Sequence, residues 1–261
     1  MDIPELITVI KKCADILLKY RNSPDLVIET KEDGSKVTNV DKEANEILQS
    51  YLKEKYPTYG IMSEELEKEC KEYTWYIDPL NGTGSYLRGS DYFNILVGLT
   101  RKNKPILGLI YHPLYDKLYI GGENEIPRVI TSDGEFNLVM SSTKKQNLLF
   151  TPSENWENIF KELFNDDPKY TLVHGNDLGE EFKDPRIHII EGGINLQINS
   201  NFWAWGPWDV CSGDAILSAL GGVMTDYYGN DIDYSTPMLN DGFIASDSIE
   251  RIKNLPWIKE M

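Results

Sequence analysis

The stretch Trp75-Tyr-Ile-Asp-Pro-Leu-Asn-Gly-Thr83 is the most informative part of this 261-residue chain. Its first three residues are apolar and predict a buried strand. The strand ends on the carboxylate of Asp78, and Pro-Leu-Asn-Gly is typical of a turn, which leads to the Thr83 hydroxyl. Carboxylate and carbonyl oxygens bind hard cations, and free backbone N–H groups bind phosphate. Taken alone, the stretch is better explained by ordinary turn chemistry.

Three further segments place acidic residues at the ends of predicted elements. They are Val37-Thr-Asn-Val-Asp41, Ile61-Met-Ser-Glu-Glu65 and Trp208-Asp-Val-Cys-Ser-Gly213. The first and the last open helical patterns, and the second is a short apolar run. Each has a simpler explanation, because Glu64 and Glu65 could be surface charge, and Asp41 and Asp209 could complement the N-terminal dipoles of their helices.

Together and in this order, the segments resemble the magnesium-dependent, lithium-sensitive phosphatase superfamily. That group includes inositol monophosphatases, inositol polyphosphate 1-phosphatases, 3'(2'),5'-bisphosphate nucleotidases and fructose-1,6-bisphosphatases. Its signatures are D-P-[LI]-D-G-T after an apolar strand, and W-D-x-[AC]-[ASG]-[GP] opening a helix that Gly-Gly closes. The resemblance spans the chain from about Lys31 to about Asp231.

Within the superfamily, the chain is most similar to the bisphosphate nucleotidases and inositol polyphosphate 1-phosphatases. The similarity rests on Lys31–Thr38, Lys104–Pro113, Ile189–Gly192 and Cys211. Gly84-Ser85-Tyr86 departs from these enzymes, which commonly have Lys-Glu-[FY] after the Thr.

The element pattern predicts a mixed fold, α/β (α+β). Apolar runs at 93–101, 105–112 and 117–120, joined by polar turns, predict an antiparallel meander. Later in the chain, a helix at 156–164 and strands at 170–173 and 187–190 indicate alternating strands and helices. The resemblance implies a layered αβαβα sandwich with the site between two subdomains. We expect an N-terminal α+β subdomain, residues 1–140, with the antiparallel sheet and the metal-site turn, and a C-terminal α/β subdomain, residues 141–261, with Asp209.

Composition limits the partners. The net charge of −16 argues against binding to a nucleic-acid polymer, which needs a basic surface. No apolar run is long enough to span a bilayer, so no membrane partner is expected. There is no signal-peptide pattern, and the three cysteines, Cys13, Cys70 and Cys211, are expected to be reduced thiols of a cytoplasmic protein. The expected partner is a small phosphorylated substrate, and the pattern leaves the oligomeric state open.

The resemblance also implies a set of metal ligands for two or three Mg²⁺ ions. The first ion, with the attacking water, would be bound by Glu64, Asp78 and the Leu80 carbonyl. A second ion near the leaving oxygen would be bound by Asp78, Asn81 and Asp209. Bound cations would invert the local sign of this acidic protein and allow an anionic substrate to bind.

The catalytic residues implied in the same way are Asp41, Glu64 and Thr83. Asp41 would help to hold a third, loosely bound ion. The N–H groups of Gly82 and Thr83 would bind the phosphate, and the Thr83 hydroxyl would relay the proton of the water, oriented by Asp41 or Glu64. Glu65 would support these ligands without binding metal.

Asn81 departs from the family, which has Asp at this position. An amide keeps one neutral oxygen ligand and loses a charge, so affinity for the second metal and activity should fall. Three explanations stay open: an engineered inactivation, a natural enzyme with weaker metal binding, or a pseudo-enzyme that binds ligand without turnover. The other site residues favour an enzyme.

We therefore expect a Mg²⁺-dependent phosphomonoesterase acting on a small bisphosphorylated metabolite. Adenosine 3',5'-bisphosphate, hydrolysed to AMP, is the first hypothesis and inositol 1,4-bisphosphate the second. The alternatives are a catalytically impaired phosphometabolite-binding protein, or an inositol monophosphatase or fructose-1,6-bisphosphatase. The aromatic cluster Phe202–Trp208 could stack a nucleobase, although core packing is the simpler explanation.

Overall fold

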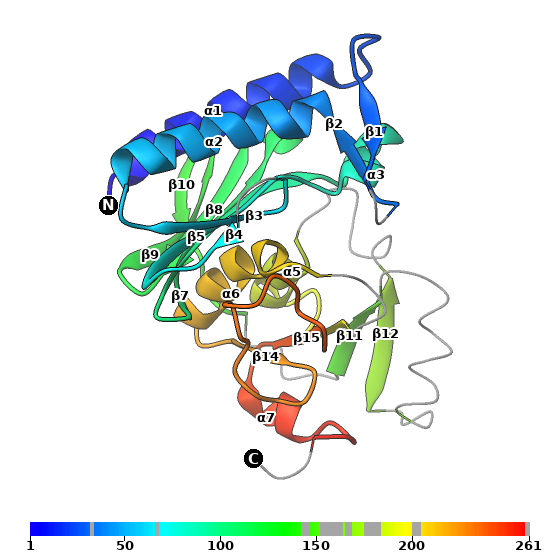
Figure 1. The fold of residues 1–261 in the computed structure, drawn as a ribbon. Helices are drawn as coiled ribbons and strands as arrows, with labels where there is room; N and C mark the ends of the chain where they lie inside the picture. Colours follow the sequence, from blue (N-terminus) through cyan, green and yellow to red (C-terminus); the bar gives the residue numbers. More distant parts are fainter. Residues whose placement is uncertain are drawn as a thin grey trace.

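The computed structural model describes residues 1–31, 34–65, 68–141, 147–151, 164, 169–174, 184–199 and 205–258. The fold is mixed α+β and confirms the layered sandwich, in which helices cover and separate two sheets (Figure 1). Three clusters of buried apolar side chains lie between successive layers.

The larger sheet has eight strands in the order β10-β9-β8-β7-β6-β5-β3-β4. In chain order these are β3 (Gly60–Ser63), β4 (Lys68–Glu69), β5 (Tyr73–Asn81), β6 (Asn94–Arg101), β7 (Lys104–His112), β8 (Lys117–Gly122), β9 (Glu125–Thr131) and β10 (Gly134–Asn137). The predicted meander is confirmed as the antiparallel run β6–β7–β8. Among the described strands of this sheet, only β3 and β5 pair in parallel, so the C-terminal ends of both strands reach the same edge of the sheet.

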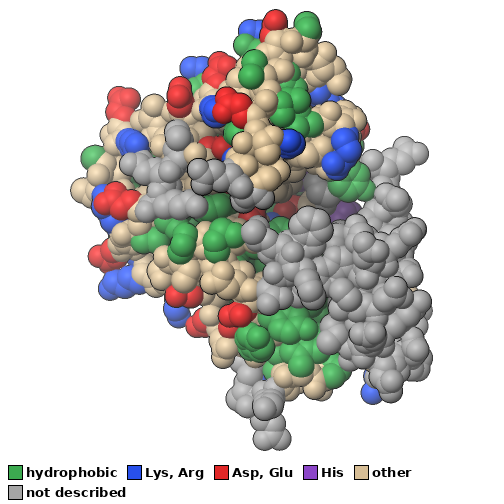
Figure 2. Space-filling view, turned by 45° about the vertical axis from the view of Figure 1, so that its right-hand side comes forward, with side chains coloured by type: hydrophobic (Ala, Val, Ile, Leu, Met, Phe, Trp, Pro, Cys, Tyr) green, Lys and Arg blue, Asp and Glu red, His purple; other side chains and the backbone are tan. Residues whose placement is uncertain are grey.

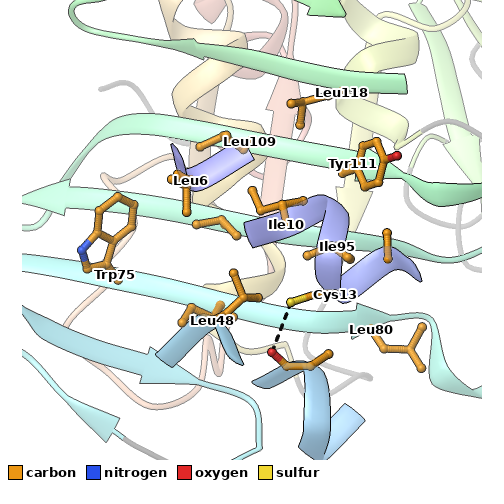
Figure 3. Packing of buried hydrophobic residues seen from close by; sticks show 14 of the residues in the cluster. Leu6, Ile10, Cys13, Leu48, Trp75, Leu80, Ile95, Leu109, Tyr111 and Leu118 are labelled. Atoms are coloured by element: carbon orange, nitrogen blue, oxygen red, sulfur yellow. Dashed lines mark hydrogen bonds between the residues drawn. The ribbon is translucent and has the colours of Figure 1, made fainter. Parts of the chain in front are cut away.

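Helices α1 (Ile3–Tyr20) and α2 (Asn39–Lys55) lie side by side on one face of this sheet (Figure 1). The Asp2 side chain caps α1 by accepting a hydrogen bond from the Glu5 N–H. Apolar residues at helical spacing then face the sheet and pack on it (Figure 3). A short hairpin of β1 (Ile28–Thr30) and β2 (Lys36–Thr38) joins the two helices.

The opposite face of the sheet is covered by α6 (Cys211–Ala219), which follows the 3-10 turn η3 (Pro207–Asp209). Gly98, Gly108 and Gly121 lie opposite one another on β6, β7 and β8. A Cβ on Gly98 would lie 2.6 Å from the Cys211 Sγ, and one on Gly108 would overlap the Ser212 backbone. The three glycines therefore let α6 pack directly on the sheet backbone.

The second sheet has five strands in the order β12-β11-β13-β15-β14. They are β11 (Asn147–Thr151), β12 (Tyr170–His174), β13 (Leu196–Asn199), β14 (Val223–Asp226) and β15 (Phe243–Ser246). The helices α5 (Pro185–Glu191) and α6 contact each other in the layer between the two sheets. The helix α7 (Ile249–Lys253) packs against β15.

One predicted strand is wrong, since residues 187–190 lie in the helix α5. The run of isoleucines reads as a strand, but Asp184 caps the helix by accepting from the Arg186 N–H at 2.9 Å. Pro185 occupies the first helical turn, and Gly192 ends the helix in the left-handed conformation. The predicted helix at 156–164 lies outside the described residues except for Phe164.

The predicted turn after Asp78 is also different, because β5 continues to Asn81 with a shift in its register between Asp78 and Asn81. Such a bulge re-aims side chains at a strand end. In the part of the chain that the structure describes, no helix is long and apolar enough to cross a membrane. Cys13, Cys70 and Cys211 are free thiols.

Candidate active site

Asp78 and Leu80 lie in the bulged end of β5. Asp78 is buried, and its Oδ1 accepts a hydrogen bond from the Leu80 N–H at 3.1 Å. The Leu80 side chain lies in the core beneath α1 and α2 (Figure 3), so its backbone has little freedom. The Leu80 carbonyl oxygen accepts a hydrogen bond from the Thr83 hydroxyl at 3.1 Å. The bulge thus groups a carboxylate, a carbonyl and a hydroxyl.

Gly82 joins β5 to the short helix α3 (Thr83–Leu87) in the left-handed conformation, with φ of 89°. A Cβ here would lie 2.5 Å from the Tyr92 carbonyl oxygen, so both the conformation and the space require glycine. The first N–H groups of a helix have no acceptor within it. Those of the Gly82–Thr83 segment are therefore suited to an anionic ligand.

Asp41 lies in the first turn of α2 and serves two groups at once. Its Oδ2 accepts from the Thr38 N–H at 2.8 Å, completing a capping box with that residue. Its Oδ1 accepts from the Thr83 hydroxyl at 3.0 Å. Asp41 therefore does act as a helix-terminal carboxylate, which is the simpler explanation. The same side chain also accepts a hydrogen bond from the candidate catalytic hydroxyl of Thr83.

Asp209 ends the turn η3 just before α6. Its Oδ2 accepts from the Gly206 N–H at 2.7 Å, so this carboxylate also caps a turn. Its carbonyl oxygen accepts from Arg186 Nη2 at 2.8 Å. Arg186 is buried and pairs with the buried Asp184 at 2.7 Å. No motif in the sequence assigns a role to Arg186 or Asp184. The sequence Asp184-Pro185, which is typical of a helix start, is the signal that could locate them.

Glu64 and Glu65 follow β3. The Glu64 N–H donates to the Ile77 carbonyl at 3.2 Å, which puts Glu64 beside the end of β5. The Lys31 Nζ lies 3.0 Å from Glu64 Oε1 and 2.8 Å from Glu65 Oε1. Lys31 lies in the β1–β2 hairpin, and no sequence motif indicates that it reaches these carboxylates. Burial raises the pKa of Glu65 to about 7, although the hydrogen bond from Lys31 opposes this.

The carboxylates of both halves of the chain influence one another. Burial, followed by the charges of Glu64, Asp209 and Asp41, raises the pKa of Asp78 well above its usual value. Burial and then the charge of Glu64 raise the pKa of Asp209 to about 7. The charge of Asp209 is among the causes of the pKa shift of Asp78, so these two carboxyl groups lie near each other. Burial also raises the pKa of Asp41, against its hydrogen bonds from Thr38 and Thr83.

This donor set fits a hard divalent cation. All its members are oxygens, and their mutual repulsion is what a cation would relieve. Within the described ranges, no three Asp, Glu, His or Cys side chains converge into a complete ligand group. Lys31 contacts Glu64 instead, and Asn81 adds a neutral oxygen. Asn81 Nδ2 donates to Asn94 Oδ1 at 3.0 Å, so this bond does not use the Asn81 oxygen.

Other candidate features lie elsewhere. Trp208 is buried, and Trp205 packs against the same core between the sheets, which supports the packing explanation for these two rings. Residues 202–204 of the predicted stacking cluster lie outside the described residues. Figure 2 shows acidic and basic side chains interspersed over the coloured part of one face.

The comparisons with known proteins agree on the family. The chain is 30% identical to a fructose-1,6-bisphosphatase/inositol-1-monophosphatase of Aquifex aeolicus over 215 residues, 76% of this chain and 75% of that protein. It is 28% identical to the 3'(2'),5'-bisphosphate nucleotidase CysQ of Buchnera aphidicola over 240 residues, 88% of each chain. The fold is similar to that of a Thermotoga maritima IMPase with a TM-score of 0.75 at 19% identity, over 97% of this chain and 95% of that one. The model of the inositol monophosphatase family matches residues 3–255, and the chain therefore belongs to that family.

Proposed function

We propose that this chain is a Mg²⁺-dependent phosphomonoesterase that removes one phosphate from a small bisphosphorylated metabolite. The family supports a metal-dependent phosphatase of small phosphorylated substrates. The observation that most supports catalysis is the position of the Thr83 hydroxyl. It donates hydrogen bonds to the Asp41 carboxylate and to the Leu80 carbonyl oxygen, next to the buried carboxylate of Asp78. Adenosine 3',5'-bisphosphate is the first candidate substrate and inositol 1,4-bisphosphate the second.

The chain's own residues would bind the substrate and move a proton. Bound Mg²⁺ ions would supply an activated water and neutralise the charge of the phosphoryl group. Their ligands would be Glu64, Asp78, the Leu80 carbonyl, Asn81 and Asp209, with Asp41 for a third, weaker site. The Thr83 hydroxyl would accept the proton of the water and pass its own proton to Asp41 Oδ1, along the 3.0 Å hydrogen bond. The Gly82 and Thr83 N–H groups would donate to phosphate oxygens.

The second candidate is a phosphometabolite-binding protein with impaired catalysis, and Asn81 is the observation that favours it. An amide ligand would weaken the metal site near the leaving oxygen, where negative charge develops. The named relatives favour turnover, because both the bisphosphate nucleotidase and the fructose-1,6-bisphosphatase/inositol-1-monophosphatase are phosphatases by name.

A phosphate-release assay distinguishes the two. The natural chain and Asn81→Asp are each given adenosine 3',5'-bisphosphate, inositol 1,4-bisphosphate, inositol 1-phosphate and fructose 1,6-bisphosphate, with Mg²⁺ varied and Li⁺ as inhibitor. Asn81→Asp should increase turnover by about 10²-fold or more, because it restores a charged ligand in the transition state. Asn137→Asp is the matched control, since it adds the same charge on the exposed strand β10 at the far edge of the sheet.

Each other outcome has a definite meaning. If Asn81→Asp binds these compounds by calorimetry and releases phosphate from none of them, the chain is a binding protein. If it neither binds nor hydrolyses any of them, the proposed function is wrong. Hydrolysis of the monophosphate or of the hexose bisphosphate alone would keep the reaction and change the substrate.

A further inference from the structure

Asn81 and Asn94 face each other across two paired strands. They are directly opposite in the antiparallel register of β5 and β6, just after the shift in register that begins at Asp78. Side chains at opposite positions of a sheet lie on the same face and contact each other. Here the contact is a hydrogen bond of 3.0 Å from Asn81 Nδ2 to Asn94 Oδ1.

Asn94 is fully buried, with 0% of its side chain exposed. In the described structure its Nδ2 has no hydrogen-bond partner. A buried amide nitrogen without an acceptor is destabilising, so an apolar residue here would satisfy the core better. Within the described residues, the Asn94 side chain hydrogen-bonds to Asn81, and this contact is the evident reason for a polar residue at the position.

An asparagine beside a cation differs from an aspartate in the orientation it needs as well as in its charge. A carboxylate has two equivalent oxygens, so its orientation does not matter, whereas a carboxamide has one oxygen ligand and one NH₂ group that a cation repels. An amide ligand must therefore be held with its oxygen toward the ion. A hydrogen bond that takes up the NH₂ group has this effect.

We propose that Asn94 is a positioning residue, which accepts a hydrogen bond from Asn81 Nδ2 and so turns the Asn81 oxygen toward the metal site. This rests on the proposed function, because it presumes that Asn81 lies at a metal site. It goes further by assigning a second residue, Asn94, to the orientation of the Asn81 side chain.

The same amide at position 94 would also serve an aspartate at position 81. If Asn94 turned over, its Nδ2 would donate to the carboxylate and gain the partner that it lacks. Asn81→Asp is therefore compatible with the natural Asn94. A carboxylate at position 94 suits Asn81 alone, because two like charges directly opposite each other on a sheet are destabilising.

The experiment is a double-mutant cycle with two readouts, calorimetric Mg²⁺ affinity and the melting temperature without metal. The variants are Asn94→Leu, which removes the acceptor at similar volume, and Asn94→Asp, which keeps an acceptor and loses the donor. Each is made in the natural chain and in Asn81→Asp. If Asn94→Leu does not fold, Asn94→Ser takes its place, because the serine side chain is too short to replace the amide acceptor.

In the natural chain, Asn94→Leu should weaken Mg²⁺ binding by about tenfold or more, the usual effect of losing a residue that orients a metal ligand. In the Asn81→Asp background the same change should alter affinity by no more than about twofold, since the carboxylate needs no orientation. Without metal, Asn94→Asp should lower the melting temperature in both backgrounds, because it buries a charge. The decrease should be larger in Asn81→Asp, where a second carboxylate lies directly opposite.

An equal loss of Mg²⁺ affinity in the two backgrounds would overturn the positioning role and reduce Asn94 to a packing residue. An equal change in melting temperature on Asn94→Asp in both backgrounds would show that positions 81 and 94 do not interact. A third result is also possible, in which no variant binds Mg²⁺ but the melting temperatures without metal show the expected coupling. In that case Asn81 and Asn94 do interact, whereas the proposed metal site and the proposed function are both wrong.

Discussion

The hydroxyl of Thr83 and the carboxylate of Asp41 are joined by a hydrogen bond of 3.0 Å across 42 positions of sequence. Asp41 lies in the first turn of α2, on one face of the large sheet. Thr83 follows β5, a strand that α2 contacts. The capping box fixes the carboxylate, and the carboxylate in turn fixes the hydroxyl. The position of the candidate catalytic group thus depends on ordinary helix capping.

Thr83→Ala tests the hydroxyl. In the Asn81→Asp background it should lower kcat strongly and leave substrate affinity nearly unchanged, because the backbone N–H groups that would bind phosphate remain. Steady-state kinetics with a calorimetric substrate Kd provide the comparison. Thr8→Ala, on the exposed face of α1, removes a hydroxyl far from the site and serves as the control. A large rise in the substrate Kd with unchanged kcat would contradict a role in proton transfer.

Asp41→Asn separates catalysis from capping. The asparagine oxygen can still accept the hydrogen bond from the Thr38 N–H, so the loss of stability should be about 1 kcal/mol or less. In the Asn81→Asp background, kcat should nevertheless fall, since an amide cannot accept the proton from Thr83. The experiment measures kcat and the melting temperature of one protein sample. A lowered melting temperature with unaltered kcat would leave Asp41 with a purely structural role.

Divalent cations should stabilise the fold. Mg²⁺ or Ca²⁺ binding to buried, repelling carboxylates favours the folded state, by about 2.7 kcal/mol when the free ion is at 100 times its Kd. Thermal melts across a millimolar Mg²⁺ series measure the effect, with the double variant Asp78→Asn/Asp209→Asn as the control that should lose it. A melting temperature indifferent to Mg²⁺ in the natural chain would count against the site.

Without metal, the contribution of Asp209 to the stability of the fold should decrease as the pH rises. A carboxylate with a lowered pKa would have the opposite effect. Burial raises the pKa of Asp209 to about 7 in the folded chain, whereas the unfolded value is about 4. Between these values the folded state binds more protons, so this group's contribution to stability falls as pH rises. Melts in chelator from pH 4 to 8 should show a decline that Asp209→Asn reduces. Added Mg²⁺ should stabilise more at pH 8 than at pH 5, and the reverse order would contradict the assignment.

Lys31 should compete with the metal for Glu64. Its ammonium group contacts both glutamates, of which Glu65 is only 3% exposed at its side chain. Lys31→Met should therefore lower the melting temperature without metal, because it leaves buried charge unpaired, and should enlarge the stabilisation by Mg²⁺. Lys42→Met removes an exposed pair with Glu29 and should change either quantity little. Equal Mg²⁺ responses of the natural chain and Lys31→Met would exclude competition.

Much of the fold could be predicted because its signals are local. The meander β6–β7–β8 is a series of apolar runs separated by short polar turns, and α1 has its apolar residues at helical spacing. Isoleucines at three of the four positions 187–190 predict a strand, although these residues form the helix α5. Its capping residues, Asp184 and Gly192, were the better guide.

The site could be predicted only in part, for a physical reason. The site residues themselves lie in short motifs, and the structure brings Asp41 to Thr83 and Asp78 to Asp209. Their neighbours depend on register and on the reach of a hairpin. Asn94 faces Asn81 only because of the bulge in β5, and Lys31 meets Glu64 only because β1 and β2 pair. Neither relation is encoded within one stretch of sequence.

The glycines beneath α6 have a consequence for evolution and for engineering. Helices usually rest on sheets through side chains, which can repack when one of them changes. Between Gly108 and Ser212 there is no such compliant layer, because backbone meets backbone. Main-chain contacts therefore set the distance between Asp78, which lies in the sheet, and Asp209, which precedes α6. A single methyl group added at Gly108 would alter the separation of two carboxylates that it never touches, and its phenotype would look like the loss of a ligand.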